Sequence, residues 1–534
     1  MTIDTESTNT DCNANNAPSF DADDKERKKQ LVLQTLLSHC HETSKVRELR
    51  AMSQAAVQDL VCDVLSGGYT NYAYRICLPK TTTTPDDVQL FAKLTFEYPA
   101  WKTDTTPFSL ERTLHEYQAM IDFANLLTSS STNTNENDSE LSSPPPPPVA
   151  TPYLCVDVTD SDNTKYKLLV TQWAPVEEPL ANQFIEGHVD PRVITTVAES
   201  LAILHAFPNI DPNWNDCFRS GIDTTFAPMK ETIVTAIFDD KKDMNDCVEF
   251  GRQLGVNVLH DSVDAMMNEM KHKRQVWVHG DAHSFNILVE SSIGVDDLEE
   301  TQGTFGPTGR VCFCDWEMTG CGPWGRDCGV FMAWPIACAL THAMLGNEQQ
   351  ADAIWKSIER FWDCYIDSIQ VKMREQESQQ SQSFVVGKDV RLALRTAMAA
   401  SSFFLFVVNY LLGIQTEFLP TQDLSEKDRK TLLASIGLTG LKLMILGYGE
   451  SITGVDHHPE YNIEELRDAL RSIVQEQREK LSSIARERET ERRPRRRVSS
   501  ILRETGRRVS DAFMMEQAIE ELRQERSSLI SADS

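Results

Sequence analysis

Two patterns of apolar and polar positions divide the chain. In its first third, apolar residues alternate with polar ones over short stretches, which is the period of a half-buried strand. Farther along, apolar residues recur every three or four positions, which is the period of an amphipathic helix. The first pattern predicts strands at residues 72–78, 88–96 and 166–173. The second predicts helices at residues 193–207, 351–370, 391–413 and 432–446.

The order of these elements indicates an α+β fold in which a small β-rich N-lobe precedes a larger, mostly helical C-lobe. Such a two-lobed fold has a cleft between the lobes, where ligands usually bind. A disordered insert that ends in a run of prolines interrupts the N-lobe at residues 128–150. The predicted domains are a disordered tail at 1–25, the N-lobe at 26–175, the C-lobe at 176–455 and a charged helical or disordered tail at 456–534.

The amino-acid composition of the chain argues against several classes of function. The 534 residues include 52 Lys and Arg against 80 Asp and Glu, which gives a formal net charge of −28. Nucleic-acid binding is not expected, because a phosphate backbone is bound by a basic surface. The 13 cysteines form no C-x-x-C pair, and residues 1–24 contain neither Lys nor Arg. A zinc cage, a disulfide framework and a secretory signal are therefore not expected, and the predicted localisation is cytoplasmic.

One uncharged stretch, residues 396–414, is long enough to cross a bilayer. The polar side chains of Ser401, Ser402 and Asn409, and the lack of a basic cluster just beyond the stretch, favour a buried core helix instead. No membrane contact is expected, and a membrane protein remains the alternative.

The motif W-V-H-G-D-A-H-S-F-N-I-L-V at residues 277–289 places polar residues between two predicted strands, with Asn286 five residues after Asp281. This spacing suits phosphoryl transfer, in which an Asp accepts the proton of the substrate hydroxyl and an Asn five residues later holds Mg²⁺. We therefore expect Asp281 to be catalytic and Asn286 to bind the metal. A hairpin with polar residues at its turn is the alternative.

A pair of carboxylates follows a further predicted strand, in V-C-F-C-D-W-E. Asp315 and Glu317 occupy alternate positions, so an extended chain presents both on one side. Mg²⁺ binds to one or two carboxylates together with substrate phosphates. Both residues are therefore predicted metal ligands, and an acidic turn at the strand end is the alternative.

Three features of the N-lobe suggest phosphate binding. Gly67 and Gly68 follow an apolar run, and glycines let backbone amides approach phosphates closely. Lys93 lies on a predicted strand, and Glu116 lies on a predicted helix at residues 110–120. A strand Lys paired with a helix Glu holds the α- and β-phosphates in kinases. An ordinary hairpin turn and a solvated Lys are the alternatives.

These parts occur in one order along the chain: Gly turn, Lys strand, Glu helix, H-G-D-x-x-x-x-N and D-x-E. In that order they resemble the aminoglycoside phosphotransferase and choline kinase superfamily, which has a protein-kinase-like fold, over residues 61–449. The resemblance implies a soluble kinase that uses ATP and Mg²⁺ to phosphorylate a hydroxyl group of a small molecule. The implied ATP-binding residues are Gly67, Gly68, Thr70, Asn71, Lys93, Glu116, Gln172 and Ala174. The implied structural supports are His279, Asp327 and His205.

The chain resembles two subfamilies, and each implies a different substrate. D-W-E-M-T-G-C-G-P-W-G-R-D-C-G at residues 315–329 resembles the methylthioribose kinase pattern in matching register, although Ile445 and Leu446 stand where that pattern carries an Arg pair. Choline and ethanolamine kinases share G-G-x-T-N at residues 67–71. A methylthioribose-kinase-like phosphotransferase is the expected function, with choline or ethanolamine kinase as the alternative. A pseudokinase, which binds ligands without turnover, is the alternative of another class.

The C-terminal segment departs from the acidic balance of the chain. Residues 486–508 are rich in Arg, and R-R-V-S occurs twice, ending at Ser499 and Ser510. This pattern suits basophilic protein kinases, so such a kinase is a predicted partner that acts on both serines. Helical spacing from Asn462 with few aromatic residues predicts a long, solvent-exposed helix outside the catalytic core. A solvated helix or a nonspecific anion-binding patch is the alternative.

Overall fold

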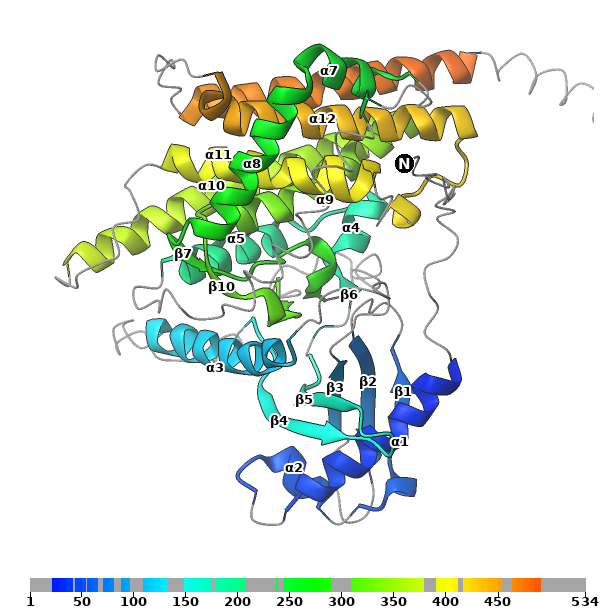
Figure 1. The fold of residues 1–534 in the computed structure, drawn as a ribbon, viewed down its shortest axis with the longest axis vertical. Coiled ribbons are helices and arrows are strands. Elements are labelled where there is room, and N and C mark those ends of the chain that lie inside the picture. Colours follow the sequence, from blue (N-terminus) through cyan, green and yellow to red (C-terminus); the bar gives the residue numbers. More distant parts are fainter. Residues whose placement is uncertain are drawn as a thin grey trace, which may run out of the picture.

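Two lobes follow one another along the chain, as the sequence pattern predicts (Figure 1). Figure 1 shows a small lobe built around a sheet at one end of the molecule and a stack of helices at the other. The computed structural model describes residues 22–41, 44–53, 55–65, 71–80, 88–96, 109–131, 148–174, 176, 178–206, 237–238, 244–290, 309–378, 390–411, 416–453 and 463–490.

The N-lobe is built on one antiparallel sheet of five strands in the order β1-β2-β3-β5-β4. The three predicted strands are confirmed as β2, β3 and β5. One core covers the sheet, where Leu33 and Leu36 of the first helix pack with Tyr74 and Ile76 of β2. The strands are β1 (Val61–Val64), β2 (Asn71–Leu78), β3 (Val88–Phe96), β4 (Pro152–Thr159) and β5 (Lys165–Gln172).

Helices flank this sheet. Helix α3 lies between the sheet and the helical lobe and packs on β4 and β5 (Figure 1). It also contacts the short turn η3 of the C-lobe, so it joins the two lobes. The elements are α1 (Ala22–His39), α2 (Arg47–Met52), η1 (Val57–Asp59), α3 (Glu111–Ser131) and η3 (Trp316–Met318). Helix α1 thus begins inside the segment predicted as a disordered tail, and α3 enters the predicted insert.

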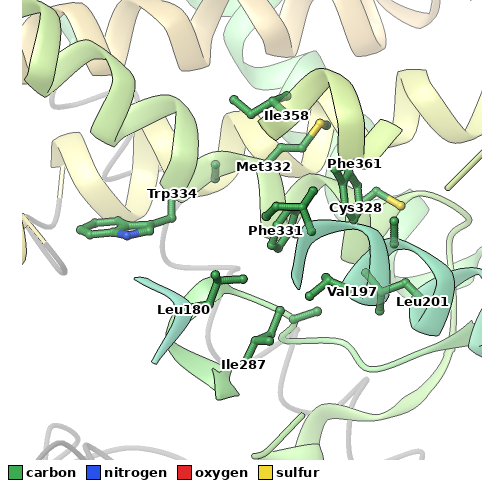
Figure 2. Close-up of a cluster of buried hydrophobic side chains, with 14 of the residues drawn as sticks. Leu180, Val197, Leu201, Ile287, Cys328, Phe331, Met332, Trp334, Ile358 and Phe361 are labelled. Carbon is green, nitrogen blue, oxygen red and sulfur yellow. The ribbon is translucent and has the colours of Figure 1, made fainter. Parts of the chain in front are cut away.

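The C-lobe is a helical layer around α9, in which every residue from Arg326 to Met344 is buried. Burial on all sides explains why this helix is apolar around its whole circumference. Figure 2 shows Phe331 and Met332 of α9 beside Ile358 and Phe361 of α10. The helices are α4 (Leu180–Glu186), α5 (Pro191–His205), α7 (Asp246–Leu254), α8 (Val256–His272), α9 (Arg326–Leu345), α10 (Glu348–Ser378), α11 (Val390–Ser402), η4 (Phe403–Leu411), η5 (Thr416–Phe418) and α12 (Glu426–Thr453).

Two small sheets fix the positions of the loops between the lobes. One has the order β6-β8-β9, and the other pairs β10 with β7. In the first, Ile287 pairs with Phe313, so the segment before β8 lies beside the segment after β9. The elements are β6 (Glu178–Pro179), β7 (Val276–Val278), η2 (Ser284–Asn286), β8 (Ile287–Val289), β9 (Val311–Phe313) and β10 (Gly320–Gly322).

A helix at residues 463–490 packs on the C-lobe, which corrects the expectation of a solvent-exposed helix. Its apolar residues Leu466, Leu470, Val474 and Leu481 are buried in the same core as α9 and α10. Its arginines pair with acidic residues of α10: Arg467 with Asp363, Arg471 with Glu359, Arg478 with Asp352 and Arg486 with Glu348. The partner numbers fall on α10 as they rise on this helix, so the two helices run antiparallel. Ser499 and Ser510 lie outside the described residues.

Three described helices are long and apolar enough to cross a membrane by length and composition. Their apolar windows are Arg326–Leu345, Ala393–Tyr410 and Glu426–Tyr448, of which 94%, 76% and 72% is buried inside the protein. The second window overlaps the stretch predicted as a buried core helix. Packing against neighbouring helices accounts for the apolar character of these segments.

Candidate active site

Lys93 is the centre of a buried charge cluster between the lobes. It lies on β3 with 5% of its surface exposed. Its Nζ is 2.8 Å from Oε2 of Glu116 on α3, 2.5 Å from Oδ1 of Asp315 and 3.1 Å from Oε2 of Glu317. The strand Lys and the helix Glu singled out in the sequence therefore form an ion pair, and both carboxylates of the D-x-E motif join it.

The loop after β7 carries Asp281 and Asn286 side by side. The side-chain amide of Asn286 donates to the backbone oxygen of Asp281 at 3.0 Å and to its Oδ2 at 3.2 Å. The amide nitrogen is thus used within the loop, which leaves the amide oxygen to bind a cation. Gly280 turns the chain with a φ of +87°, and a Cβ there would lie 2.1 Å from the carbonyl oxygen of Met318. Only glycine fits this turn.

Asp327 fixes the backbone of this loop. Its carboxylate accepts the backbone N–H groups of His279 at 2.7 Å and Gly280 at 2.9 Å, and it lies 3.1 Å from Nε2 of His205. Burial by itself would raise the pKa of Asp327, but the hydrogen bonds from His205 and the loop lower it. Asp327 is therefore an ionised, fully buried anchor under the loop.

A chain of buried side chains orients His205. The Tyr365 hydroxyl is 2.7 Å from Nε1 of Trp324 and 2.6 Å from Nδ1 of His205. An indole nitrogen can only donate, so the tyrosine oxygen accepts from Trp324 and its proton points to Nδ1 of His205. Nε2 of His205 then carries the proton that bonds Asp327. This chain connects α10 to the loop of Asp281.

Asp315 emerges from β9 in a conformation that side chains rarely adopt, with a φ of +63°. Such a residue persists only where its surroundings hold it. Here the backbone N–H of Trp316 donates to Oε1 of Glu116 at 3.2 Å, and the Trp316 ring packs on His279. The backbone N–H of Cys314 donates to the backbone oxygen of Asn286 at 2.9 Å. These contacts place Asp315 beside the loop of Asn286.

Unequal pKa shifts follow from three carboxylates sharing one lysine. Burial would lower the pKa of Lys93, but Asp315, Glu116 and Glu317 raise it well above its usual value. Burial raises the pKa of Glu116 to about 7 against the opposing effect of Lys93, and it also raises that of Asp315. The pKa of Glu317 falls to about 2 despite its burial, because Lys93 and Arg112 both lie beside it. Glu317 is therefore the most firmly ionised of the three.

The oxygens in this cluster suit a hard divalent cation. Oxygens of Glu116, Asp315 and Glu317 all lie within 4.8 Å of one another. Carboxylate and amide oxygens are the ligands that Mg²⁺ prefers. Asp315 and Asn286 meet this requirement from adjacent segments, and Glu317 lies in the same cluster.

The segment that contains these motifs matches a known family. Residues 139–355 match the model described as the phosphotransferase enzyme family, and this range includes Asp281, Asn286, Asp315 and Asp327. Over this segment, the match supports the predicted resemblance to the aminoglycoside phosphotransferase and choline kinase superfamily.

Three solved structures illustrate what the chain is similar to. A choline kinase from Cryptosporidium parvum Iowa II is 9% identical, with 85% of this chain and 96% of that chain covered and a TM-score of 0.32. A glucosamine kinase is 11% identical, with 73% and 82% covered and a TM-score of 0.38. An ADP-bound aminoglycoside phosphotransferase is 11% identical, with 71% and 94% covered and a TM-score of 0.26. No curated protein matches the sequence.

The structure describes only some of the remaining residues that were predicted to contact the nucleotide. Gly67, Gly68 and Thr70 lie outside the described residues. Of the predicted hinge residues, Gln172 donates its backbone N–H to the oxygen of Thr151 at 2.8 Å, inside the sheet. Ala174 follows β5 and is half-buried.

Asn71, predicted to contact ATP, is buried at the start of β2. Its amide donates to Oε2 of Glu317 at 3.2 Å, so in this structure it belongs to the charge cluster.

Two residues of the candidate site, Arg112 and His283, were not predicted from the sequence. Arg112 donates through Nε to Oε2 of Glu317 at 3.2 Å. It lies four positions before Glu116, so helical spacing was the signal that could have found it. His283 lies two residues after Asp281, with its Nε2 3.5 Å from Oδ2 of that residue. Its place inside the H-G-D-x-x-x-x-N motif was the available signal.

Proposed function

We propose that this protein is an ATP-dependent small-molecule kinase that transfers the γ-phosphoryl group of ATP to a substrate hydroxyl. The observation that carries the proposal is the convergence of side chains from both lobes on one site. Lys93 and Glu116 come from the N-lobe, whereas Asp281, Asn286 and Asp315 come from the C-lobe. Phosphoryl transfer needs this division, because one lobe holds the nucleotide and the other positions the acceptor.

The N-lobe residues bind the nucleotide in this proposal. Lys93, held by Glu116, donates to the α- and β-phosphates, and Gly67 and Gly68 remain the proposed backbone contacts to them. The backbone at Gln172 and Ala174 meets the adenine. Because the N–H of Gln172 is already bonded to Thr151, Ala174 is the better placed donor of the two.

Asp315 and Asn286 hold Mg²⁺ in this proposal, because they offer hard oxygens from adjacent segments. When bound, the ion neutralises the charge of the phosphates in the transition state. Asp315 is kept in its unusual backbone conformation by its surroundings, which include the hydrogen bond from the Trp316 backbone N–H to Glu116.

Asp281 acts at the acceptor side. It orients the substrate hydroxyl and accepts its proton as the bond between that oxygen and the γ-phosphorus forms, while the bond from the γ-phosphorus to the bridging oxygen breaks and ADP leaves. The amide of Asn286 holds the carboxylate in place, and Asp327 fixes the loop beneath it. Catalysis then depends mainly on positioning and charge stabilisation.

A small polyol or a thio-sugar is the proposed acceptor, as in a methylthioribose-kinase-like enzyme. The motif register at residues 315–329 supports it. A quaternary amine would need an exposed aromatic cage. Trp324 and Trp334 could have supplied one, but both are fully buried, and their indole N–H groups bond Tyr365 and Ala181.

Choline or ethanolamine is the second candidate acceptor, and a different pair of rings favours it. Phe285 lies between Asp281 and Asn286, and its ring is 5.2 Å from that of Phe418, which is 43% exposed. Phe285 is half-buried, so the pair presents one exposed ring beside the catalytic loop, which is suited to a cationic substrate.

The described cysteines are free thiols, which supports the proposal of a reducing, cytoplasmic location. Fractionation of native cells would test the location.

A panel of acceptors decides between the candidate substrates. ADP release is measured with methylthioribose, related sugars, choline and ethanolamine, on the wild type and on Phe418→Ala. The proposal predicts the highest kcat/KM for a polyol or thio-sugar, with little effect of Phe418→Ala. A choline rate far above the others, lost in Phe418→Ala, would select the second candidate. No acceptor-dependent turnover, with ATP still bound, would indicate a pseudokinase.

A further inference from the structure

Arg112 is a buried arginine inside the charge cluster for which the proposed reaction provides no role. It lies on α3 with 4% of its surface exposed. Its Nε donates to Oε2 of Glu317 at 3.2 Å, and its Nη2 donates to Oδ1 of Asn71 at 3.3 Å and to the backbone oxygen of Phe96 at 3.1 Å. One side chain thus joins α3, the start of β2, the end of β3 and the D-x-E segment.

Glu317 receives an unusual number of donors as a result. Its Oε2 lies 3.2 Å from Arg112, 3.2 Å from the amide of Asn71 and 3.1 Å from Nζ of Lys93. An oxygen with three donors has no lone pair left for a cation, so only Oε1 of Glu317 could still bind one. By contrast, among the residues that the structure describes, only Lys93 bonds the carboxylate of Asp315.

We propose that Arg112 is a positioning residue that engages Glu317, so that nucleotide-free protein does not gather a divalent cation at the three carboxylates and Lys93 remains available to the nucleotide. This role rests on the proposed function, because it assigns Asp315 and Asn286 as the metal-holding pair. It revises the sequence prediction that Glu317 is a direct ligand.

The charge balance gives the expected effect. Three carboxylates, Glu116, Asp315 and Glu317, face two cations, Lys93 and Arg112, so the cluster carries one net negative charge when all are ionised. Arg112→Gln increases this to two negative charges. Glu317→Gln reduces it to zero. The double variant has the same net charge as the wild type.

Mn²⁺ is the probe, and free Mn²⁺ is measured by electron paramagnetic resonance on nucleotide-free, full-length protein at pH 8. Arg112→Gln should bind Mn²⁺ at least about tenfold more tightly than the wild type, since each added charge a few ångströms away contributes strongly at a buried site. Glu317→Gln should bind it more weakly, and the double variant should return to the wild-type affinity. A merely structural arginine would give no such reversal.

Arg192→Gln is the matched control, because Arg192 also pairs with a carboxylate, Asp190 at 2.8 Å, outside the site. It should leave Mn²⁺ binding unchanged. In the same proteins, ATP titration with and without Mg²⁺ should show weaker nucleotide binding in Arg112→Gln, because the unpaired Glu317 retains Lys93.

Equal Mn²⁺ affinity in the wild type, Arg112→Gln and the double variant would overturn the role of Arg112. If Arg112→Gln does not fold, Glu317→Gln decides the question, and unchanged or tighter Mn²⁺ binding by that variant contradicts the proposal. The titration needs no acceptor substrate. If no acceptor reacts, the proposed function is contradicted, but the Mn²⁺ titration still tests the role of Arg112.

Discussion

At the scale of single residues, the buried Glu116 makes the site sensitive to pH. Burial raises its pKa from 4.5 to about 7, although Lys93 opposes the shift. A raised carboxyl pKa contributes stability below about pH 4.5, and that contribution is lost as pH rises through about 7. Ionised Glu116 is nevertheless the partner that Lys93 needs for nucleotide binding.

We therefore expect kcat/KM for ATP to fall about tenfold for each pH unit below about 7, since this ratio reports groups of the free enzyme. Lys93 stays charged well above that range, because its own pKa is raised. Steady-state kinetics between pH 5.5 and 8.5, in roughly half-unit steps, would measure the profile. Glu116→Gln should have a lower plateau without this acidic limb, and a limb unchanged in that variant would assign it to another group.

A single glycine determines the geometry of the catalytic loop. Gly280→Ala should abolish transfer, because its Cβ would meet the carbonyl of Met318 at 2.1 Å and displace Asp281. Gly255→Ala is the matched control, since Gly255 has a similar φ of +86° but nothing within 4 Å of its Cβ. It should cost about 1–3 kcal/mol of stability, because a φ of +86° with a ψ of 155° strains any residue except glycine, and it should leave kcat unchanged. Similar kcat values in both variants would show that the close contact has no catalytic importance.

At the scale of elements, the chain of Trp324, Tyr365, His205 and Asp327 transmits the position of α10 to the catalytic loop. Tyr365→Phe removes the hydroxyl that fixes the tautomer of His205. We expect kcat to fall about tenfold with KM for ATP unchanged, and stability to fall by about 1–3 kcal/mol. Kinetics and urea unfolding of the same preparation separate the two effects.

Tyr410→Phe is the control for Tyr365→Phe, because its hydroxyl bonds Asn245 away from the catalytic loop, at 3.1 Å. The Tyr410→Phe variant should be less stable than the wild type, but its kcat should be unchanged. Equal losses of kcat in both variants would show that the hydrogen bonds of Tyr365 have only a general stabilising role.

The sequence predicted those parts of the site whose signal is local. The spacing of Asp281 and Asn286, the D-x-E pair and the strand Lys each occur within a few residues. Contacts between distant elements leave no such signal: Arg112 meets a carboxylate 205 positions away, and His205 meets a hydroxyl 160 positions away. Periodicity likewise predicted β3 at its observed bounds, whereas α1 lies partly in a stretch whose polar composition concealed its apolar face.

At the scale of the whole molecule, the helix at residues 463–490 is part of the C-lobe. Its charged composition concealed a buried row at Leu466, Leu470, Val474 and Leu481, which lie on one face at helical spacing. The antiparallel row of arginines against α10 lies at the margin of this apolar contact. Exposed ion pairs contribute little each, so the apolar row supplies most of the stability.

Truncation tests this assignment. Removal of all residues after 462 exposes the apolar partners of that row, so we expect a loss of about 5 kcal/mol or more, or insoluble protein. Removal of only the residues after 490 keeps the helix and should leave stability near that of the full chain. Thermal unfolding of the two truncated proteins measures the difference. A stable, active 1–462 protein would restore the expectation that the segment is dispensable.

The central claim is that the site transfers a phosphoryl group with Asp281 at the acceptor. The most direct measurement follows γ-labelled ATP with the best acceptor, on the wild type and on Asp281→Asn, together with MgATP binding to each. The account predicts labelled, phosphorylated acceptor from the wild type, a rate about 10²- to 10⁴-fold lower in Asp281→Asn, and similar MgATP binding by both proteins. Transfer by Asp281→Asn at the wild-type rate would contradict it.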